Sequence, residues 1–142
     1  MHGYKQLEHT ADIAIEIYAD KIVNLFPAGM EAWLDLSVSG TTFNPNVTLR
    51  IELSGNTYEE LIIDFLGELN FQLHVNKMLF SQINQISLSE RDGEYFLNSE
   101  TVGEEVNFDK FYIKEEIKAV TYHQVDIKEK DNLFTTKIIF DI

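Results

Sequence analysis

Two polar clusters at opposite ends of the chain contain residue types that bind metals or transfer protons. Glu8–Asp12 (EHTAD) precedes the first apolar alternation, Lys118–His123 (KAVTYH) lies near the other end, and Asp141 and Ile142 end the sequence. If the native chain ends at Ile142, its carboxylate and Asp141 place two anions on adjacent residues, and Asp12 would add a third where the two ends of the chain meet. Like charges about 4 Å apart repel by roughly 4 kcal/mol at an effective dielectric of 20. Such a cluster therefore needs a proton, a cationic side chain or a metal ion.

The ligand type limits which metal could bind there. Carboxylates offer only oxygen ligands, which select hard cations such as Ca²⁺, Mg²⁺ or Mn²⁺. On the residues alone, the simpler interpretation of Asp141 is a solvated carboxylate at the end of a strand.

His9 and His123 leave three interpretations open. They could ligate a transition metal, they could hydrogen-bond to the carboxylates and orient them, or backbone carbonyls could satisfy them. Direct ligation is the least favoured of the three. An Asp12–His9 or Asp141–His123 dyad could also serve as a general base, because histidine titrates near neutrality, but no nucleophile is aligned with either dyad.

Lys118 and Glu104 complete the candidate set. The Lys118 ammonium could contact a partner or the cluster, or it could lie in water with its stem over the sheet. Glu104 and Glu105 follow Gly103. They could pair with Lys118, face a basic partner, or solvate a turn.

Composition and charge argue against several function classes. The chain has 142 residues, of which 24 are acidic and 11 basic, for a net charge of −13, and it has no cysteine. Disulfides, thiolate zinc sites and cysteine nucleophiles are therefore excluded. Proteins bind nucleic-acid phosphates mainly through lysine and arginine side chains. The sequence has only two arginines, Arg50 and Arg91, so we expect no direct nucleic-acid binding. The acidic surface suits either solubility or a basic protein partner.

Familiar catalytic and targeting motifs are missing from the sequence. It contains no P-loop, GxGxxG, GxSxG or HExxH pattern. No apolar run approaches the roughly 20 residues of a membrane span, and Met1–Lys5 lacks the start of a signal peptide. We therefore expect a cytoplasmic protein with no membrane partner.

Apolar periodicity predicts the elements that must position these clusters. Alternation predicts strands over Ile13–Tyr18 and Val47–Leu53. Helical spacing predicts a helix over Ile22–Leu36 and a second helical stripe from Leu61 to Leu69. Thr57 and Glu60 have the spacing of a helix capping box. Pro27 should either kink the first helix or lie in its first turn.

The pattern in the second half of the chain predicts two β-hairpins. Asp92-Gly93 separates strands predicted at 82–89 and 94–98, and Asp-Gly is a strong hairpin signal. The last pair is predicted over Glu116–Lys128 and Leu133–Ile142. The element order predicts a single α+β domain over residues 1–142, with two helices packed on one mixed or mostly antiparallel sheet.

A tight turn at Asp131-Asn132 sets the register of the last hairpin. It pairs Lys130 with Leu133, and counting outward places Tyr122 opposite Asp141 and His123 opposite Phe140. A slip of one residue would exchange these neighbours, so the pattern predicts proximity between the two strands and no more.

Several of these motifs together resemble the archease family. They are EHTADI from Glu8, GEE at Gly103–Glu105, IKAVTYH at Ile117–His123, the terminal aspartate, and a central helix from Tyr58 to Phe71. The resemblance covers essentially the whole chain and implies an archease-like α+β fold.

The resemblance also implies roles for the candidate residues. It makes Asp12 and Asp141 ligands of a divalent metal ion, with the Ile142 carboxylate as the third. Ca²⁺ is the first choice, and Mg²⁺ and Mn²⁺ are the alternatives. The remaining candidates would orient the ligands or contact a partner, and they are His9, Lys118, His123 and Glu104.

The function implied by the resemblance is that of a non-catalytic accessory protein. Archease assists the RtcB-type RNA ligase in tRNA splicing and RNA repair, by promoting guanylylation of the ligase and its multiple turnover. Two alternatives stay open. One is a chaperone or specificity modulator of a tRNA-modifying methyltransferase, and the other is a small metal-dependent hydrolase.

Overall fold

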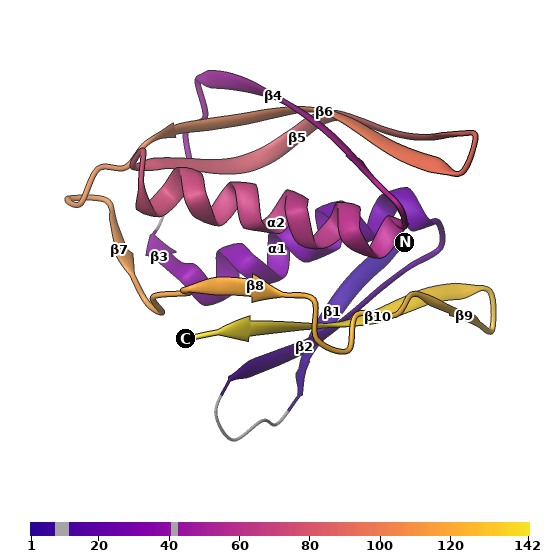
Figure 1. Ribbon diagram of the computed structural model, residues 1–142. Helices are drawn as coiled ribbons and strands as arrows, with labels where there is room; N and C mark the ends of the chain where they lie inside the picture. The colour runs from indigo at the N-terminus through magenta and orange to yellow at the C-terminus, as the bar shows by residue number, and fades with distance from the viewer. Residues whose placement is uncertain (8–11, 41–42) are drawn as a thin grey trace.

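The two long helices lie side by side in a layer between two antiparallel β-sheets, as Figure 1 shows for this computed structural model. The structure describes residues 1–7, 12–40 and 43–142. All strand pairs within these ranges are antiparallel. The predicted α+β class, with two helices on a mostly antiparallel framework, is confirmed. The strands are divided among three sheets instead of one.

A five-stranded sheet joins the two ends of the chain. Its central path runs β1-β2-β10-β8, and β9 also pairs with β10. The bounds of these strands are β1 His2–Leu7, β2 Ile13–Ala19, β8 Ala119–Thr121, β9 Lys128–Lys130 and β10 Leu133–Asp141.

The other strands form a three-stranded sheet in the order β4-β6-β5 and a short pair, β3-β7. Their bounds are β3 Val38–Gly40, β4 Val47–Gly55, β5 Met78–Arg91, β6 Glu94–Glu105 and β7 Phe111–Ile113. The hairpin of β5 and β6 extends well beyond the predicted 82–89 and 94–98.

The helices follow the predicted apolar stripes. A 3₁₀ turn, η1 (Ile22–Asn24), leads into α1 (Leu25–Ser37), and α2 spans Tyr58–His74. Pro27 is the third residue of α1 and so lies in its first turn, where a missing backbone N–H costs no helical bond. The second of the two predicted roles of Pro27 is therefore the observed one.

The cap of α2 matches the predicted capping box with one difference. Thr57 Oγ1 accepts a hydrogen bond from the Glu60 N–H at 3.1 Å. The returning bond to Glu60 Oε2 comes from the Asn56 N–H at 2.9 Å, one residue before the cap. Both contacts satisfy donors that a helix start leaves unpaired.

Aromatic side chains fill the space between the helix layer and the sheets. Phe26 on α1 and Phe65 on α2 meet edge to face, with ring centroids 5.7 Å apart. The largest fully buried side chains come from both helices and from the strands around them: Trp33, Phe26, Phe65, Phe111 and Phe140. The predicted aromatic and leucine stripes are therefore core.

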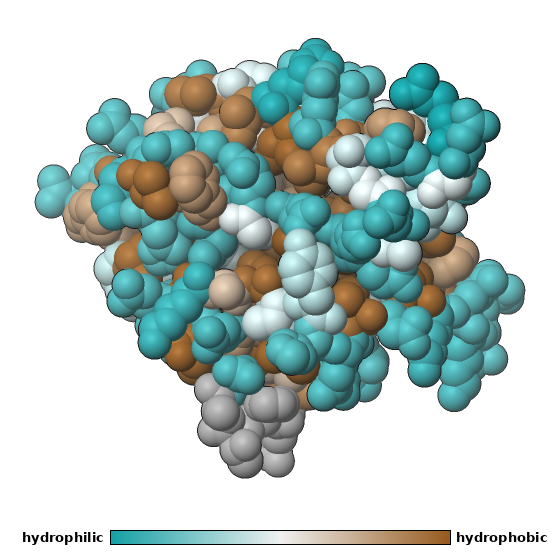
Figure 2. Space-filling model, viewed as in Figure 1, coloured by the Kyte–Doolittle hydropathy of each residue, from teal (hydrophilic) through white to brown (hydrophobic). Residues whose placement is uncertain are grey.

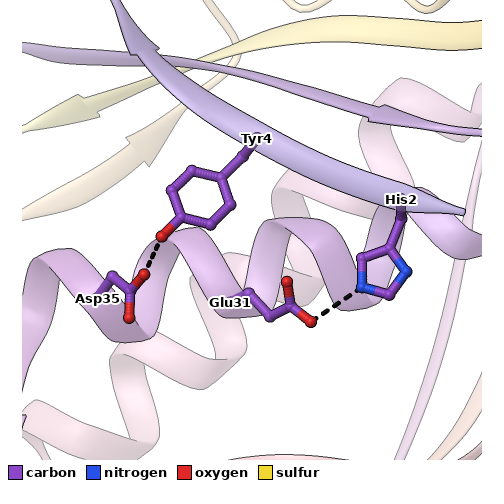
Figure 3. Close-up of polar contacts among 4 residues, drawn as sticks. All are labelled: His2, Tyr4, Glu31 and Asp35. Atoms are coloured by element: carbon purple, nitrogen blue, oxygen red, sulfur yellow. Dashed lines mark hydrogen bonds and ion pairs between the residues drawn. The ribbon is translucent and has the colours of Figure 1, made fainter.

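Polar contacts attach the edge strand β1 to α1. Figure 3 shows His2 and Tyr4 on β1 pointing toward Glu31 and Asp35 on α1. His2 Nε2 lies 2.9 Å from Glu31 Oε1, and the Tyr4 hydroxyl donates to Asp35 Oδ2. These side chains hold β1 on the helix layer in addition to its backbone pairing with β2.

Both predicted hairpin turns are confirmed by their backbone angles. Asp92 and Gly93 have φ values of 54° and 80°, and Asp131 and Asn132 have 54° and 64°. Positive φ at both central residues defines the type I′ turn, which matches the twist of antiparallel strands. Lys130 pairs with Leu133 as predicted.

The predicted register farther along the last hairpin is wrong. Asp141 pairs with Ala119 instead of Tyr122, and Phe140 pairs with Val120 instead of His123. Residues 122–127 leave the ladder between β8 and β9, so the predicted continuous strand Glu116–Lys128 is also wrong.

A local loop explains this shift of three residues. Gln124 has a φ of 61°, and the Asp126 N–H donates to Thr136 Oγ1 at 3.0 Å instead of to a backbone carbonyl of β10. The segment 122–127 therefore takes up three more residues than the facing part of β10.

Among the described residues, no helix is long and apolar enough to cross a membrane.

Candidate functional site

Three strand ends from distant parts of the sequence converge at one edge of the five-stranded sheet. Ile13, the first residue of β2, pairs with Phe140 on β10. Continued by one residue, this antiparallel register places Asp12 opposite Asp141. On the other side of β10, Asp141 pairs with Ala119 of β8. In Figure 1 the C-terminus lies at this edge, beside β8 and the start of β2.

Alternation along β10 places Asp141 on the sheet face that points away from the helices. Ile138 and Phe140 are fully buried on the opposite face, and Asp141 is exposed. Facing residues of antiparallel strands project to the same side of the sheet, so Asp12 would share this outer face if the pairing of β2 with β10 continued by one residue. Carboxylates at facing positions destabilise each other unless hydrogen-bond donors, a proton or a cation offsets the repulsion.

Lys118 is fixed to Asp141 through the backbone. The Lys118 N–H donates to the Asp141 carbonyl oxygen at 2.8 Å, and the Lys118 side chain is exposed. We refer to Asp12, Lys118, Asp141 and Ile142 as the strand-end cluster. Ile142 is 36% exposed. The cluster thus contains two aspartates, one lysine and one isoleucine.

A buried polar chain holds the segment before Lys118 in place. Trp33 Nε1 on α1 donates to Asn70 Oδ1 on α2 at 3.0 Å. Asn70 Nδ2 in turn donates to the Ile117 carbonyl at 2.8 Å. Because Ile117 directly precedes Lys118, these two bonds tie both helices to the segment that borders the strand-end cluster.

Sequence reasoning missed Asn70 as a positioning residue. Its side chain is only 7% exposed, and it lies among Leu66, Leu69 and Leu73 of α2. An asparagine at a core position of an apolar helical stripe is the signal that could have revealed it, because buried amides require hydrogen-bond partners.

His123 is not brought opposite Asp141. It lies in the loop 122–127, is exposed, and its N–H donates to Thr121 Oγ1 at 3.3 Å. The preceding Tyr122 donates its hydroxyl to Asp64 on α2. That hydrogen bond raises the pKa of Tyr122 to about 12. The loop is therefore attached to α2, and Lys137 Nζ on β10 also donates to Gln124 Oε1 in the loop at 3.2 Å.

Glu104 lies on the three-stranded sheet, apart from the strand-end cluster. It is 7% exposed, and its Oε2 accepts a hydrogen bond from the Asn44 N–H at 2.6 Å. Its Oε1 lies 3.5 Å from Lys110 Nζ. These contacts join β6 to the segments before β4 and β7, which is a structural role, and the cation beside Glu104 is Lys110 and not Lys118.

The donor set fits a divalent cation only if further oxygen or nitrogen ligands join the two aspartates. Within residues 1–7, 12–40 and 43–142, no group of three or more Asp, Glu, His or Cys side chains could hold a metal ion. His9, a predicted neighbour of the ligands, lies outside the described residues.

Comparison of the sequence with known proteins assigns the chain to a family. Residues 4–142 match the profile of the Archease protein family. The chain belongs to the archease family. Protein archease from Pyrococcus furiosus is 32% identical over 143 residues and is covered completely, as is this chain. Protein archease from Methanopyrus kandleri is 29% identical, with 98% of this chain and 99% of the relative covered.

Solved structures share the archease fold seen here. The solution structure of Methanobacterium thermoautotrophicum Protein 1598 superposes with a TM-score of 0.84 and 25% identity, covering 99% of both chains. The crystal structure of an archease from Thermotoga maritima, described as a possible chaperone, gives a TM-score of 0.55 and 22% identity. That match covers 97% of this chain and 96% of the Thermotoga chain. The family resemblance and the archease-like fold expected from the sequence are both confirmed.

Proposed function

We propose that this archease-family chain is a non-catalytic accessory protein that activates an RtcB-type RNA ligase. It would promote guanylylation and multiple turnover of the ligase in tRNA splicing and RNA repair. The observation that supports this proposal most directly is the pairing of Ile13 with Phe140, because Asp12 and Asp141 are the next residues along these two strands.

In this proposal Asp12, Asp141 and the Ile142 carboxylate hold a divalent cation, with Ca²⁺ the first choice and Mg²⁺ or Mn²⁺ the alternatives. A cation bound there would neutralise the carboxylates and offer coordination to phosphate oxygens. The Lys118 N–H keeps the Asp141 backbone in place. The Lys118 ammonium, beside the same edge, would contact phosphate groups in the partner's active site.

The overall charge supports a protein partner of opposite sign. The chain carries a net charge of −13. A ligase that binds RNA ends and GTP must carry basic, phosphate-binding surface, and complementary charge speeds association. The same charge opposes direct RNA binding by this chain.

Guanylylation of an RtcB-type ligase tests the proposal. The ligase is incubated with GTP and each divalent metal in turn, with and without wild-type protein, Asp12→Asn or Asp141→Asn. Asp131→Asn is the matched control, because it makes the same exchange at the opposite end of β10. We expect wild type and Asp131→Asn to accelerate guanylylation, and the two cluster variants to lose most of that acceleration. Equal acceleration by Asp141→Asn would contradict the role of the cluster.

A second candidate function is that of a chaperone or specificity modulator, for example of a tRNA-modifying methyltransferase. The description of the Thermotoga maritima archease as a possible chaperone favours it. This function predicts suppressed aggregation of the client, with no dependence on Asp141. A third candidate, a small metal-dependent hydrolase, predicts turnover by the isolated chain.

A further inference from the structure

A groove runs between α2 and the segment that contains β8. Its volume is about 750 Å³. Phe71 on α2 and Val75, directly after α2, are 48% and 61% exposed at this groove. Figure 2 shows hydrophobic residues lying between hydrophilic ones on the face where α2 runs beside β8 in Figure 1. The apolar lining comes from both sides of the groove: Leu53, Ile63, Phe71, Val75, Ile117 and Val120.

The groove is also predominantly acidic. Asp64 and Glu68 line it from α2, and Glu116 lines it from the opposite side, against the single ammonium of Lys118. His74 lines it too, and burial lowers the pKa of this imidazole, so it is neutral at pH 7 and does not offset the carboxylates. Exposed apolar groups bordered by carboxylates match a peptide with the opposite pattern.

We propose that this groove docks a basic amphipathic segment of the protein partner. Apolar side chains of the segment would pack on Phe71 and Val75. Its lysines and arginines would face Asp64, Glu68 and Glu116. Nucleic acid and anionic lipid are both disfavoured as occupants, because the carboxylates repel phosphate.

The groove borders the end of β10 at Lys118. Lys118 lines the groove, and its N–H donates to the Asp141 carbonyl oxygen. A segment bound along α2 would therefore lie next to the end of β10. The identity of the partner as an RtcB-type ligase rests on the proposed function, whereas the groove's shape and charge do not depend on it.

Binding of the RtcB-type ligase to charge-reversed variants tests the docking site. The groove variant is Glu68→Lys with Glu116→Lys. The control is Glu52→Lys with Glu94→Lys, which changes the net charge equally at exposed positions of the three-stranded sheet. Dissociation constants are measured by calorimetry at low and physiological salt. We expect about tenfold weaker binding by the groove variant and less than a threefold change in the control.

A second variant separates apolar packing from charge. Phe71→Gln keeps helix propensity and removes the exposed ring, so we expect about fivefold weaker binding with an unchanged salt dependence. Folding of each variant is checked by its thermal midpoint. If the groove variants bind as tightly as the control, the docking site is refuted.

The two proposals fail in different ways. Suppose that all groove variants bind the ligase as tightly as wild type, while Asp141→Asn loses activation. The docking site is then refuted and the proposed function stands. Absence of any ligase binding by wild type would refute the proposed function, and with it the partner named for the groove.

Discussion

The three-stranded and five-stranded sheets pack on the same helix layer, yet they are built in different ways. β5 and β6 form one long hairpin, and β4 pairs with β6 without interruption from Val47↔Gly103 to Gly55↔Tyr95. The five-stranded sheet combines strands from both ends of the chain. It includes β8, of only three residues, and the loop 122–127 that follows it.

The candidate chemistry lies on the five-stranded sheet. Asp12, Lys118 and Asp141 all lie at its strand ends, whereas Glu104 on the three-stranded sheet has structural contacts. Local hairpins build a rigid support, and long-range pairing brings distant polar residues together. We therefore expect changes in the three-stranded sheet to act on stability and changes around β8 to act on the site.

The largest effect on stability is expected from Gly103→Ala in β6. A Cβ at this position would lie 2.4 Å from the Leu79 carbonyl oxygen and 2.7 Å from the Phe80 Cα, so the backbone must shift. Overpacking against backbone should cost about 3 kcal/mol of unfolding free energy, measured by urea denaturation. If Asp12 and Asp141 bind a metal ion, the affinity of the folded fraction for that ion should not change.

Gly67→Ala is the matched control for that substitution. Among the described atoms, a Cβ at Gly67 in α2 meets none within 4 Å. Exchange of glycine for alanine within a helix should stabilise the protein by about 0.5–1 kcal/mol. Equal destabilisation by both variants would contradict the steric argument.

Asn70→Leu should have the next largest effect and should affect both regions. It leaves Trp33 Nε1 and the Ile117 carbonyl without their partner, which should cost about 2 kcal/mol. It also releases the segment before Lys118. If Asp12 and Asp141 bind a metal, affinity for Ca²⁺ or Mn²⁺, measured by calorimetry on folded protein, should fall several-fold.

Trp33→Phe separates stability from positioning. It removes the bond from Trp33 to Asn70 and leaves the bond from Asn70 to Ile117. It should destabilise the protein without weakening metal binding. A similar loss of affinity in both variants would show that Asn70 acts on the site through general stability alone.

The parts of the fold that the sequence predicted are those encoded locally. Asp92-Gly93 and Asp131-Asn132 formed the expected type I′ turns, because Asp, Asn and Gly tolerate positive φ. Thr57 caps α2 as its spacing with Glu60 predicted. Each of these signals lies within a few residues of the structure that it specifies.

The parts that could not be predicted depend on distant contacts. Asp141 pairs with Ala119 because of the loop around Gln124. Gln124 has a φ of 61°, a conformation that the sequence would have indicated only with glycine or asparagine at this position. The bonds of Asn70 join residues 37 and 47 positions away. In the candidate site, the neighbours of Asp141 are therefore Ala119 and Lys118, where the predicted register gave Tyr122.

Gly93→Ala tests the turn between β5 and β6 of the three-stranded sheet. Gly93 has a φ of 80°, and this left-handed conformation costs other L-residues about 1 kcal/mol. The unfolding free energy should fall by about that amount in urea denaturation. Asp92→Asn, at a φ of 54°, should leave stability nearly unchanged, because asparagine accepts this conformation. A larger loss from Asp92→Asn than from Gly93→Ala would contradict the type I′ assignment.

The smallest effect is expected at alkaline pH, from the bond that attaches the loop 122–127 to α2. The hydrogen bond to Asp64 raises the pKa of Tyr122 from 10.0 to about 12. The protonated hydroxyl is the donor, so this stabilisation is fully present below pH 10 and is lost as the pH rises toward 12. The Tyr122 side chain is 57% exposed, and solvent screening should keep the contribution below about 1 kcal/mol.

Tyr122→Phe removes both the bond and this pH dependence. In urea denaturation, the variant should be less stable than wild type at pH 9, and the two should converge as the pH approaches 12. Tyr112→Phe, at an exposed tyrosine of β7, is the control and should follow wild type throughout. A difference between wild type and Tyr122→Phe that persists unchanged to pH 12 would show that ring packing, and not the bond to Asp64, holds the loop against α2. The Tyr122 ring would then stabilise the loop by packing, in addition to the hydrogen bond from the Ile127 N–H to Glu59 Oε2 on α2.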